Sequence, residues 1–478
     1  MVQILVIAAM ALAALGDATP AEDPTGGSLA AALTFGWAIC GGALIAALAR
    51  LSAGRMDRSG DARPLLLMQL VVQIYRAGAL ATYGAAVVLM GWLDAVRSVM
   101  GDWPAIDELV AATPVWIVLT VSFAAWHPFD RRMREAALMR DLDEGRPMHR
   151  PPELVESVVR SWRHQALFLL IPLTAIIAWA EIVVFSAPAL GIGPMVAGAA
   201  QLAGAVVVFA AAPLAIRFTW DTVKLRDGPL LETLMDMANR HGVRVSGVLV
   251  WRTGGTTVNA AVSGIVPWIR YVILSDALLE HMSTRHVEAV AAHELAHVRK
   301  RHLPWLAVTV LAAVTLIGTP AGWLAVIADG LGAGGVWLSG AIAGVTLLGT
   351  FAVLGVVSRR FEWQADAFAV RHLAETHPEL APMDGRRAVG EGAIEVMVQT
   401  LGMVASLNGM SPRKWSWRHG SIAERQRRLR SLRGRPIDGL PIDRRVAGWK
   451  VGIAGAVVLA GLVIAVEALL LSATIGGG

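Results

Sequence analysis

The chain has 478 residues, of which 55% are hydrophobic and only 17% are charged, and its formal net charge is +5. A soluble protein of this length would carry more charge, and the apolar residues here form long blocks, so the composition predicts a polytopic membrane protein. Since the basic residues lie in loops between these blocks, the charge indicates membrane orientation and no nucleic-acid partner. The single cysteine, Cys40, excludes a disulfide within the chain and any cysteine-based metal site.

The N-terminus begins with the short apolar stretch "MVQILVIAAMALAALG". Residues 1–20 are interpreted either as a cleavable signal peptide or as a first membrane span. The stretch 65–76 is either an interfacial helix or the start of a long, tilted second span. The chain is expected to have about eight transmembrane helices, or nine if residues 1–20 also form a span. The clearer apolar runs predict spans at 29–49, 77–95, 111–127, 165–187, 193–215, 305–327, 336–357 and 448–472.

Two long polar segments, 217–304 and 358–447, are joined by a predicted hairpin of two spans, 305–357. Together they are long enough for one compact domain. We therefore expect an N-terminal transmembrane region at 1–216, a domain at 217–447 interrupted by the hairpin, and a C-terminal transmembrane helix at 448–478. Short strands with glycine turns and intervening helices in the first polar segment predict a mainly α protein with an α+β domain.

Loop charge predicts the orientation of the chain. The loops 50–64 and 128–164 and both polar segments are basic, whereas 17–28 and 98–110 are acidic with almost no lysine or arginine. Basic loops face the cytoplasm in membrane proteins, so the domain is expected on the cytoplasmic side of a membrane, most simply a bacterial inner membrane.

The stretch "AVAAHELAHVRKRH", Ala289–His302, contains two histidines four residues apart. On a helix, His293 and His297 share a face and can bind one metal ion, while Glu294 can reach a water molecule at that ion. Zinc suits imidazole ligands and acidifies bound water, and a glutamate can then take the water's proton. The pattern can also arise by chance, but the small apolar residues before it indicate a partly buried helix. We therefore expect one Zn²⁺ per chain, with Glu294 as the catalytic base.

A catalytic zinc site normally has three protein ligands. The residues alone leave the third ligand open. The downstream candidates are His302, Glu362, Asp366, His372, His377 and His419.

The stretches "HELAHVRKRH" and "SRRFEWQADAFAV", Ser358–Val370, together resemble the membrane-integrated metallopeptidases of the M48 family. The resemblance implies a gluzincin-type peptidase domain in which Glu362 is the third zinc ligand. It also implies that Asp366 orients a ligand histidine. The alternative for Asp366 is a surface acid that pairs with Arg359 or Arg360.

Two further stretches match the family more loosely. "NAAVSG", Asn259–Gly264, resembles a family segment that binds extended substrate as an edge strand, which implies substrate contacts at Asn259 and Ala260. Ala261 replaces a residue that is often aromatic, and a plain hairpin turn is the alternative. "HGSIAERQRRL" begins at His419, and here Gly420 replaces the family's proline. The resemblance implies that His419 or Arg425 stabilises the oxyanion, unless this stretch is only a solvated basic face.

The sequence is therefore interpreted as a membrane zinc endopeptidase that cleaves membrane or membrane-associated proteins at the cytoplasmic face, in quality control. One alternative is a transport or sensor protein with a regulatory zinc domain. Another is a repressor-cleaving sensor peptidase, although those usually carry cysteine where this chain has Ala365. Glu181 and Glu467 lie in apolar runs and are expected either to line a cavity or to lie near an interface. The oligomeric state is left open.

Overall fold

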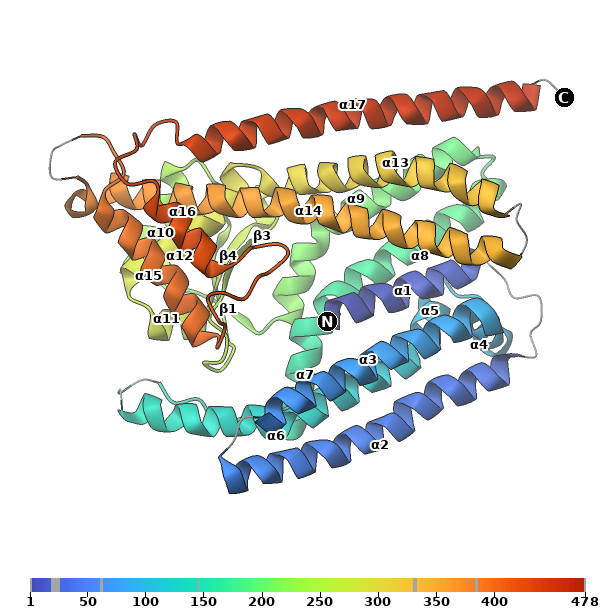
Figure 1. Ribbon diagram of the computed structural model, residues 1–478, viewed down its shortest axis with the longest axis horizontal. Coiled ribbons are helices and arrows are strands. Elements are labelled where there is room, and N and C mark those ends of the chain that lie inside the picture. Colours follow the sequence, from blue (N-terminus) through green and yellow to red (C-terminus); the bar gives the residue numbers. More distant parts are fainter. Residues whose placement is uncertain are drawn as a thin grey trace. The chain divides into compact units, whose positions relative to one another are not determined.

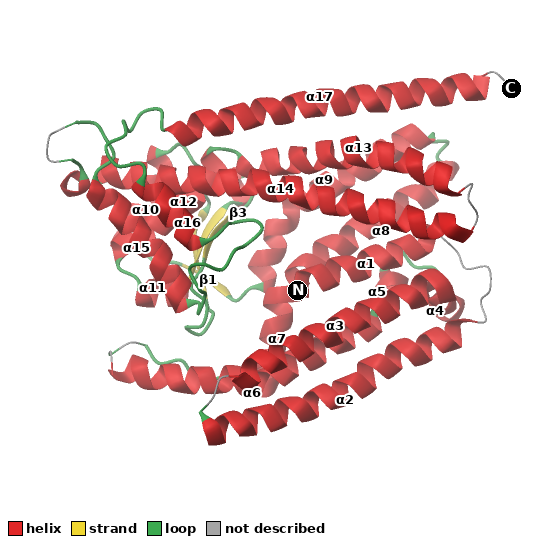
Figure 2. Ribbon diagram, in the orientation of Figure 1, coloured by secondary structure: helices red, strands yellow, loops and turns green. Residues whose placement is uncertain are grey.

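The computed structural model describes residues 2–18, 26–60, 63–143, 145, 147–329, 333–382 and 386–476. The chain divides into two compact units, residues 1–222 and 223–478, and each unit is described by itself. Helices dominate both units, and the few strands lie in the second unit (Figure 2). The predicted fold class, a mainly α polytopic protein with a small α+β part, is confirmed.

The first unit consists of helices. They are α1 Val2–Ala18, α2 Gly27–Ser59, α3 Arg63–Met90, α4 Trp92–Met100, α5 Ile106–Ala111, α6 Thr113–Asp143, α7 Leu154–Trp162, a π-helical turn at 163–167, α8 Phe168–Ala189 and α9 Pro194–Thr219.

Long helices of this unit pack along one another through small and aromatic residues. α2 packs against α3 and α6, where the Tyr75 hydroxyl donates to the Ala38 carbonyl at 2.6 Å. α3 is continuous from Arg63, so the stretch 65–76 is the start of a long helix and not a separate interfacial one. Residues 2–18 form α1, with Val6 and Ala9 fully buried against its neighbours.

The second unit contains the sheet and the remaining helices. The elements are β1 Thr222–Lys224, α10 Pro229–Arg240, β2 Gly247–Trp251, β3 Ala260–Ser263, β4 Tyr271–Ser275, α11 Asp276–His281, α12 Thr284–Arg299, α13 His302–Asp329, α14 Ala333–Thr376, α15 Glu391–Leu407, α16 Ile422–Arg430 and α17 Pro441–Gly476.

The four strands form one sheet in the order β1-β2-β4-β3. β4 runs parallel to β2 and antiparallel to β3, so β3 is an edge strand. The chain returns from β3 to β4 through Gly264, whose φ is +116° and where a Cβ atom would lie 2.5 Å from the Ile269 carbonyl oxygen. Only glycine fits this turn, so the turn fixes the register of β3 on β4.

One hydrophobic core joins the sheet to the helices of the second unit. Leu274 of β4, Leu278 of α11, Leu295 of α12 and Leu373 of α14 are fully buried in it, and Met397 of α15 closes it. α12 packs on α14 over this core. Since both helices are fixed by the same apolar contacts, polar side chains on their facing sides are held at constant separations.

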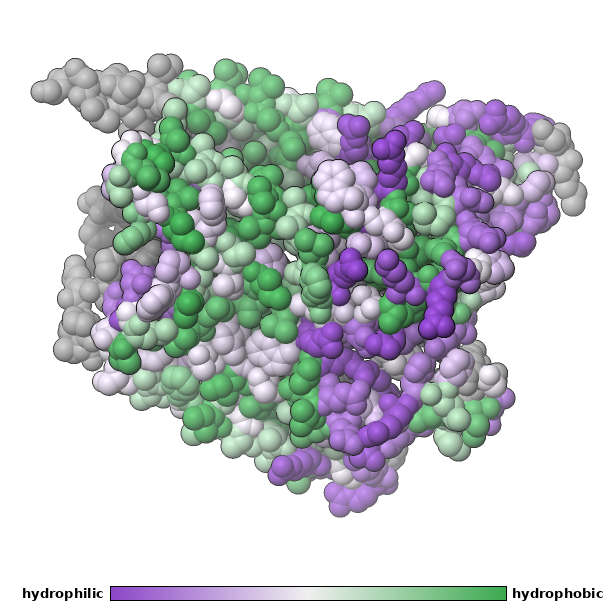
Figure 3. All heavy atoms as spheres, turned by 180° about the vertical axis from the view of Figure 1, so that it is seen from behind, coloured by the Kyte–Doolittle hydropathy of each residue, from purple (hydrophilic) through white to green (hydrophobic). Residues whose placement is uncertain are grey.

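In the described part of the chain, seven helices are long and apolar enough to cross a membrane. They correspond to the predicted spans except the run 111–127, which belongs to α6 and is not among the seven. His127, Pro128 and Asp130 interrupt the apolar stretch of α6 and lower its mean hydropathy. Much of the exposed surface of these helices is hydrophobic, in contrast to the hydrophilic areas of the same view (Figure 3).

The motif helix and the two helices that follow it differ in how they continue. α12 ends at Arg299, and Arg301 adopts a left-handed conformation with φ +56°, so α13 starts as a new helix at His302. α14, by contrast, is one helix of 44 residues that contains both the second span of the hairpin and the stretch Ser358–Val370. α13, α14 and α17 pack against one another (Figure 1).

Candidate metal centre

α12 presents the motif residues toward α14. Ser283 occupies the N-cap position, and Val287, Ala291 and Leu295 bury the opposite side of the helix in the core. This burial leaves His293 and His297 one turn apart on the side that faces α14. His293 is 7% exposed, so its imidazole lies away from bulk solvent.

α14 supplies the two carboxylates that the resemblance implied. Glu362 and Asp366 are one turn apart and are buried, at 5% and 2% exposure. The neighbouring Phe361 and Ala365 are buried as well, which fixes the rotation of α14 about its axis. The structure thus brings Glu362 and Asp366 to His293, although 69 or more positions separate them in the sequence.

The donor atoms of His293, His297 and Glu362 have the spacing of a tetrahedral metal site. The two imidazole Nε2 atoms are 3.3 Å apart, and Glu362 oxygens lie 3.6 Å from His293 Nε2 and 3.7 Å from His297 Nε2. Ligands at the usual zinc distances of about 2.0–2.2 Å, placed at tetrahedron corners, are about 3.3–3.6 Å apart. These three residues therefore fit a zinc ion of three protein ligands with one open position.

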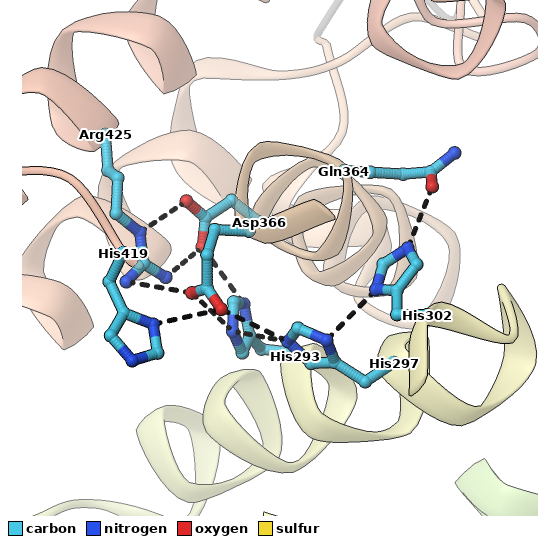
Figure 4. A network of polar contacts seen from close by, with 8 residues as sticks. His293, His297, His302, Gln364, Asp366, His419 and Arg425 are labelled. Atoms are coloured by element: carbon cyan, nitrogen blue, oxygen red, sulfur yellow. Dashed lines mark hydrogen bonds and ion pairs between the residues drawn. The ribbon is translucent and has the colours of Figure 1, made fainter. Parts of the chain in front are cut away.

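The second nitrogen of His293 faces Asp366. Its Nδ1 lies 3.0 Å from Asp366 Oδ1, which is the arrangement that fixes the orientation of a ligand imidazole. Arg425 of α16 holds Asp366 in turn through two hydrogen bonds, Nε to Oδ2 at 2.8 Å and Nη2 to Oδ1 at 2.6 Å (Figure 4). The alternative in which Asp366 is a surface acid beside Arg359 is wrong, because Arg359 donates to the Trp417 carbonyl instead.

The second nitrogen of His297 faces another histidine. His302 Nδ1 lies 3.0 Å from His297 Nδ1, and His302 Nε2 lies 2.9 Å from Gln364 Oε1 (Figure 4). If His302 donates from Nε2 to the amide oxygen, its Nδ1 is free to accept from His297, and this leaves His297 Nε2 unprotonated for a metal. The Gln364 amide nitrogen then donates to Asp443 of α17 at 2.5 Å. From the sequence, His302 was only a candidate ligand, and this role was not predicted.

Burial and partners affect the two imidazoles differently. Burial lowers the pKa of His297 to about 4, so its ring is neutral, the form that binds metal. Burial also disfavours the charged form of His293, but hydrogen bonds to Asp366 and Glu362 outweigh it and raise its pKa to about 10. The two carboxylates thus favour positive charge at this position, either a proton or a metal cation.

Glu294 lies beside the donor set, which is His293, His297 and Glu362. Among the described residues, its carboxylate forms no hydrogen bond or ion pair. Burial raises its pKa to about 7, which is the range expected of a general base.

His419 and Arg425 approach the same carboxylate from the other side. His419 Nδ1 lies 3.0 Å from Glu362 Oε1, and Arg425 Nη1 lies 3.4 Å from Glu362 Oε2. The His419 side chain is 49% exposed, whereas Arg425 is buried. Gly420 closes a tight turn with Ser416 at φ +72°, a conformation that proline cannot adopt, so the departure from the family's proline has a local cause.

The segment "NAAVSG" forms β3 at the sheet edge, so it is not a plain turn. Ser275 N–H donates to the Asn259 carbonyl at 2.9 Å. In an antiparallel pair the bonded residues alternate, so Ala261 also faces β4, while the backbone groups of Ala260 and Val262 point away from it. β3 packs beside α12, so the edge strand lies next to the motif helix.

The other histidine candidates lie elsewhere. His372 and His377 each contact a carboxylate oxygen of Glu288 at 2.9 Å, away from the donor set. Glu181, in the first unit, accepts a hydrogen bond from the Ala105 N–H at 2.8 Å. The side chain of Glu467 lies outside the described residues.

Comparisons with known proteins agree with this site. The family model for peptidase family M48 matches residues 224–431, which include every residue of the donor set. No curated protein matches the sequence. Among solved structures, the crystal structure of S. mikatae Ste24p is similar, with a TM-score of 0.44 and 14% identity over 83% of this chain and 98% of that one. The matched part of the chain is similar to peptidase family M48 and contains every residue of the candidate metal centre.

Proposed function

We propose that the chain is a membrane-integrated M48 metallopeptidase, a zinc-dependent endopeptidase that cleaves membrane or membrane-associated proteins at the cytoplasmic face. The observation that supports zinc is the spacing of the three donor atoms, 3.3 to 3.7 Å, in a set without sulfur. Imidazole and carboxylate ligands with one open position are the usual composition of a hydrolytic zinc site. When bound, zinc would polarise the scissile carbonyl and acidify a water molecule.

The residues of the chain carry the remaining chemistry. Glu294 accepts the proton of the attacking water and transfers it to the leaving amine. Asp366 and His302 hold the imidazoles of His293 and His297 in the orientation that binds metal, and Arg425 positions Asp366.

We assign oxyanion stabilisation to His419 and not to Arg425. Arg425 already donates two hydrogen bonds to Asp366, whereas half of the His419 side chain is open to solvent and substrate. His419→Ala should therefore lower kcat by roughly 10²–10³-fold with little change in zinc content.

Backbone recognition supports a broad choice of substrate. The free N–H and C=O groups of Ala260 and Val262 can pair with any extended peptide, and β3 offers only small or aliphatic side chains beside them. Such a site suits quality control better than the processing of one defined sequence. α14 contains both a candidate span and the ligand Glu362, so the site lies near the membrane and is within reach of membrane substrates.

Cleavage by a Glu294→Gln variant tests the proposed activity. The purified variant should lose cleavage of an unfolded protein substrate while it retains zinc, since glutamine keeps the size of the side chain but cannot accept the proton. The matched control is Glu395→Gln, which alters a glutamate of α15 outside the donor set. If Glu294→Gln cleaves as fast as Glu395→Gln, the chain is not a peptidase of this mechanism, and a non-proteolytic role gains support.

A further inference from the structure

A large apolar cavity lies between three candidate spans of the second unit, α13, α14 and α17. Its volume is about 780 Å³, within the range of small-molecule sites, which is roughly 300–1,000 Å³. We call it the inter-helix cavity. Its apolar part is lined by Ala312, Leu316, Val353, Val357, Ile453 and Ala456.

Two arginines line the end of this cavity that is nearer the metal centre. Arg360 precedes Glu362 on α14, and Arg445 lies in the first turns of α17. Within the described part of the chain, neither guanidinium forms an ion pair with a carboxylate. Arg360 instead stacks on the Trp363 ring at 4.3 Å, and Arg445 also lines an adjoining cavity of about 170 Å³ together with Arg428 and Arg435.

The cavity has the length of one bilayer leaflet. On α17 its lining extends from Arg445 to Ala456, which at a rise of about 1.5 Å per residue is roughly 16 Å. Half of a hydrocarbon core of about 30 Å is roughly 15 Å. Trp449 lies near the arginine end, where an aromatic side chain would mark the membrane interface.

We propose that the inter-helix cavity binds an anionic phospholipid of the surrounding bilayer. An acyl chain lies against the apolar lining, and the phosphate accepts hydrogen bonds from Arg360 and Arg445. Two uncompensated positive charges favour a phospholipid with net negative charge over a zwitterionic one, because guanidinium groups bind phosphate through paired donors. The site is separate from the metal centre and does not depend on the proposed proteolysis.

Native mass spectrometry of the protein in detergent tests the proposal. Wild-type protein should retain one phosphatidylglycerol in preference to phosphatidylcholine when both are offered in equal amounts. In Arg360→Gln/Arg445→Gln, the retained phosphatidylglycerol should fall about tenfold or more, as expected for the loss of charge-assisted contacts. Arg360→Lys/Arg445→Lys should recover part of it, which separates loss of charge from loss of fold.

A matched control removes the same charge outside the cavity. Arg299→Gln/Arg444→Gln alters basic residues of α12 and α17 that do not line it, and lipid retention should stay at the wild-type level. A second variant, Gly448→Leu/Gly452→Leu, keeps both arginines but fills the cavity. A Cβ atom at either glycine meets no heavy atom within 4 Å, so these leucines should fit and displace the acyl chain.

Four results would overturn the proposal. One is equal retention of the two phospholipids by the wild type. Another is unchanged retention in Arg360→Gln/Arg445→Gln or in the leucine variant. The third is an equal rise of Tm with inorganic phosphate and with phosphatidylglycerol, which would indicate an anion site without a lipid chain. A lipid-modified peptide recovered in place of phospholipid would likewise assign the cavity to substrate.

Discussion

Each candidate ligand histidine is oriented by a different kind of partner. His293 faces the carboxylate of Asp366, and His297 faces the neutral ring of His302. A carboxylate adds negative charge beside the metal, whereas a neutral imidazole and the Gln364 amide only fix the ring and its tautomer. The net charge of the candidate centre is therefore set mainly by Glu362, Asp366 and Arg425.

The His302 contact predicts an effect on metal affinity. His302→Ala should weaken zinc binding by about 10–100-fold, because His297 loses the acceptor that fixes its tautomer. Competition with a chromogenic chelator measures the affinity. His281→Ala, which alters a histidine of α11 outside the candidate metal centre, serves as control. Equal affinities in the two variants would mean that His302 has no part in orienting His297.

The buried pair of Arg425 and Asp366 predicts non-additive stability. Arg425→Gln should lower the free energy of unfolding by about 3–5 kcal/mol, because it leaves a buried carboxylate without its partner. Adding Asp366→Asn should restore part of the loss, since the uncompensated charge is then absent. Thermal unfolding in detergent of the two single variants and the double variant measures the coupling. Strictly additive losses would show that the pair is not a stabilising unit.

The sequence predicted the motif residues and, through the family resemblance, Asp366 as a partner of a ligand histidine, but it did not predict the partners of Asp366 and His297. His293, Glu294 and His297 are neighbours on one helix, so their spacing alone indicates the chemistry. Arg425 and Asp366 are 59 positions apart, and His302 and Gln364 are 62 apart, and no local pattern joins such residues. One signal was available for His302 and Gln364. Both lie in or beside apolar spans, and a buried polar side chain needs a polar partner.

At the scale of the element, the edge strand gives the sharpest prediction. Ala260→Pro should raise KM or abolish cleavage while zinc content and Tm stay near wild type, because it removes an N–H that points to the free edge. Ala261→Pro should lower Tm as well, since its N–H faces β4. Ala261→Ser should be mild.

Peptide cleavage, zinc content and Tm of these three variants distinguish a binding strand from a merely structural one. Full activity in Ala260→Pro would contradict backbone recognition at β3. The free edge was expected only from the family resemblance and not from the residues themselves, because strand order depends on the crossover from β2 to β4. Helix existence was predicted well, but the left-handed Arg301 that ends α12 leaves no clear mark in the sequence.

At the scale of the whole molecule, loop charge predicts which segments face the cytoplasm. In a chain whose Cys40 is replaced by alanine, a cysteine at Asp102 should react with a membrane-impermeant thiol reagent in intact cells. A cysteine at Lys414 should react only after lysis. Both positions are exposed, whereas Asp107 is buried against Arg97 and would be a poor probe. Labelling of the Lys414 cysteine in intact cells would reverse the predicted orientation.

Composition was sufficient to predict a polytopic helical protein, because apolar runs of this length typically form membrane-spanning helices. At α6 the apolar run ends at His127 and Pro128, and this helix is not among the seven candidates of the described part of the chain. Composition also placed the start of the last helix at 448, whereas α17 begins at Pro441 and contributes Asp443 to the polar chain behind His302. Polar residues such as Asp443 at the end of a span are typical of a loop in the sequence, and only the structure shows that Asp443 lies in α17 and contacts Gln364.

The most direct test of the central claim is X-ray absorption at the zinc edge on the purified protein. We expect a four-coordinate zinc with two imidazole nitrogens and oxygen ligands at about 2.0–2.2 Å and no sulfur. In Glu362→Ala, the metal content should fall sharply, whereas Glu294→Gln should retain it. Sulfur in the coordination shell, or an unchanged spectrum at full occupancy in Glu362→Ala, would contradict the site formed by His293, His297 and Glu362.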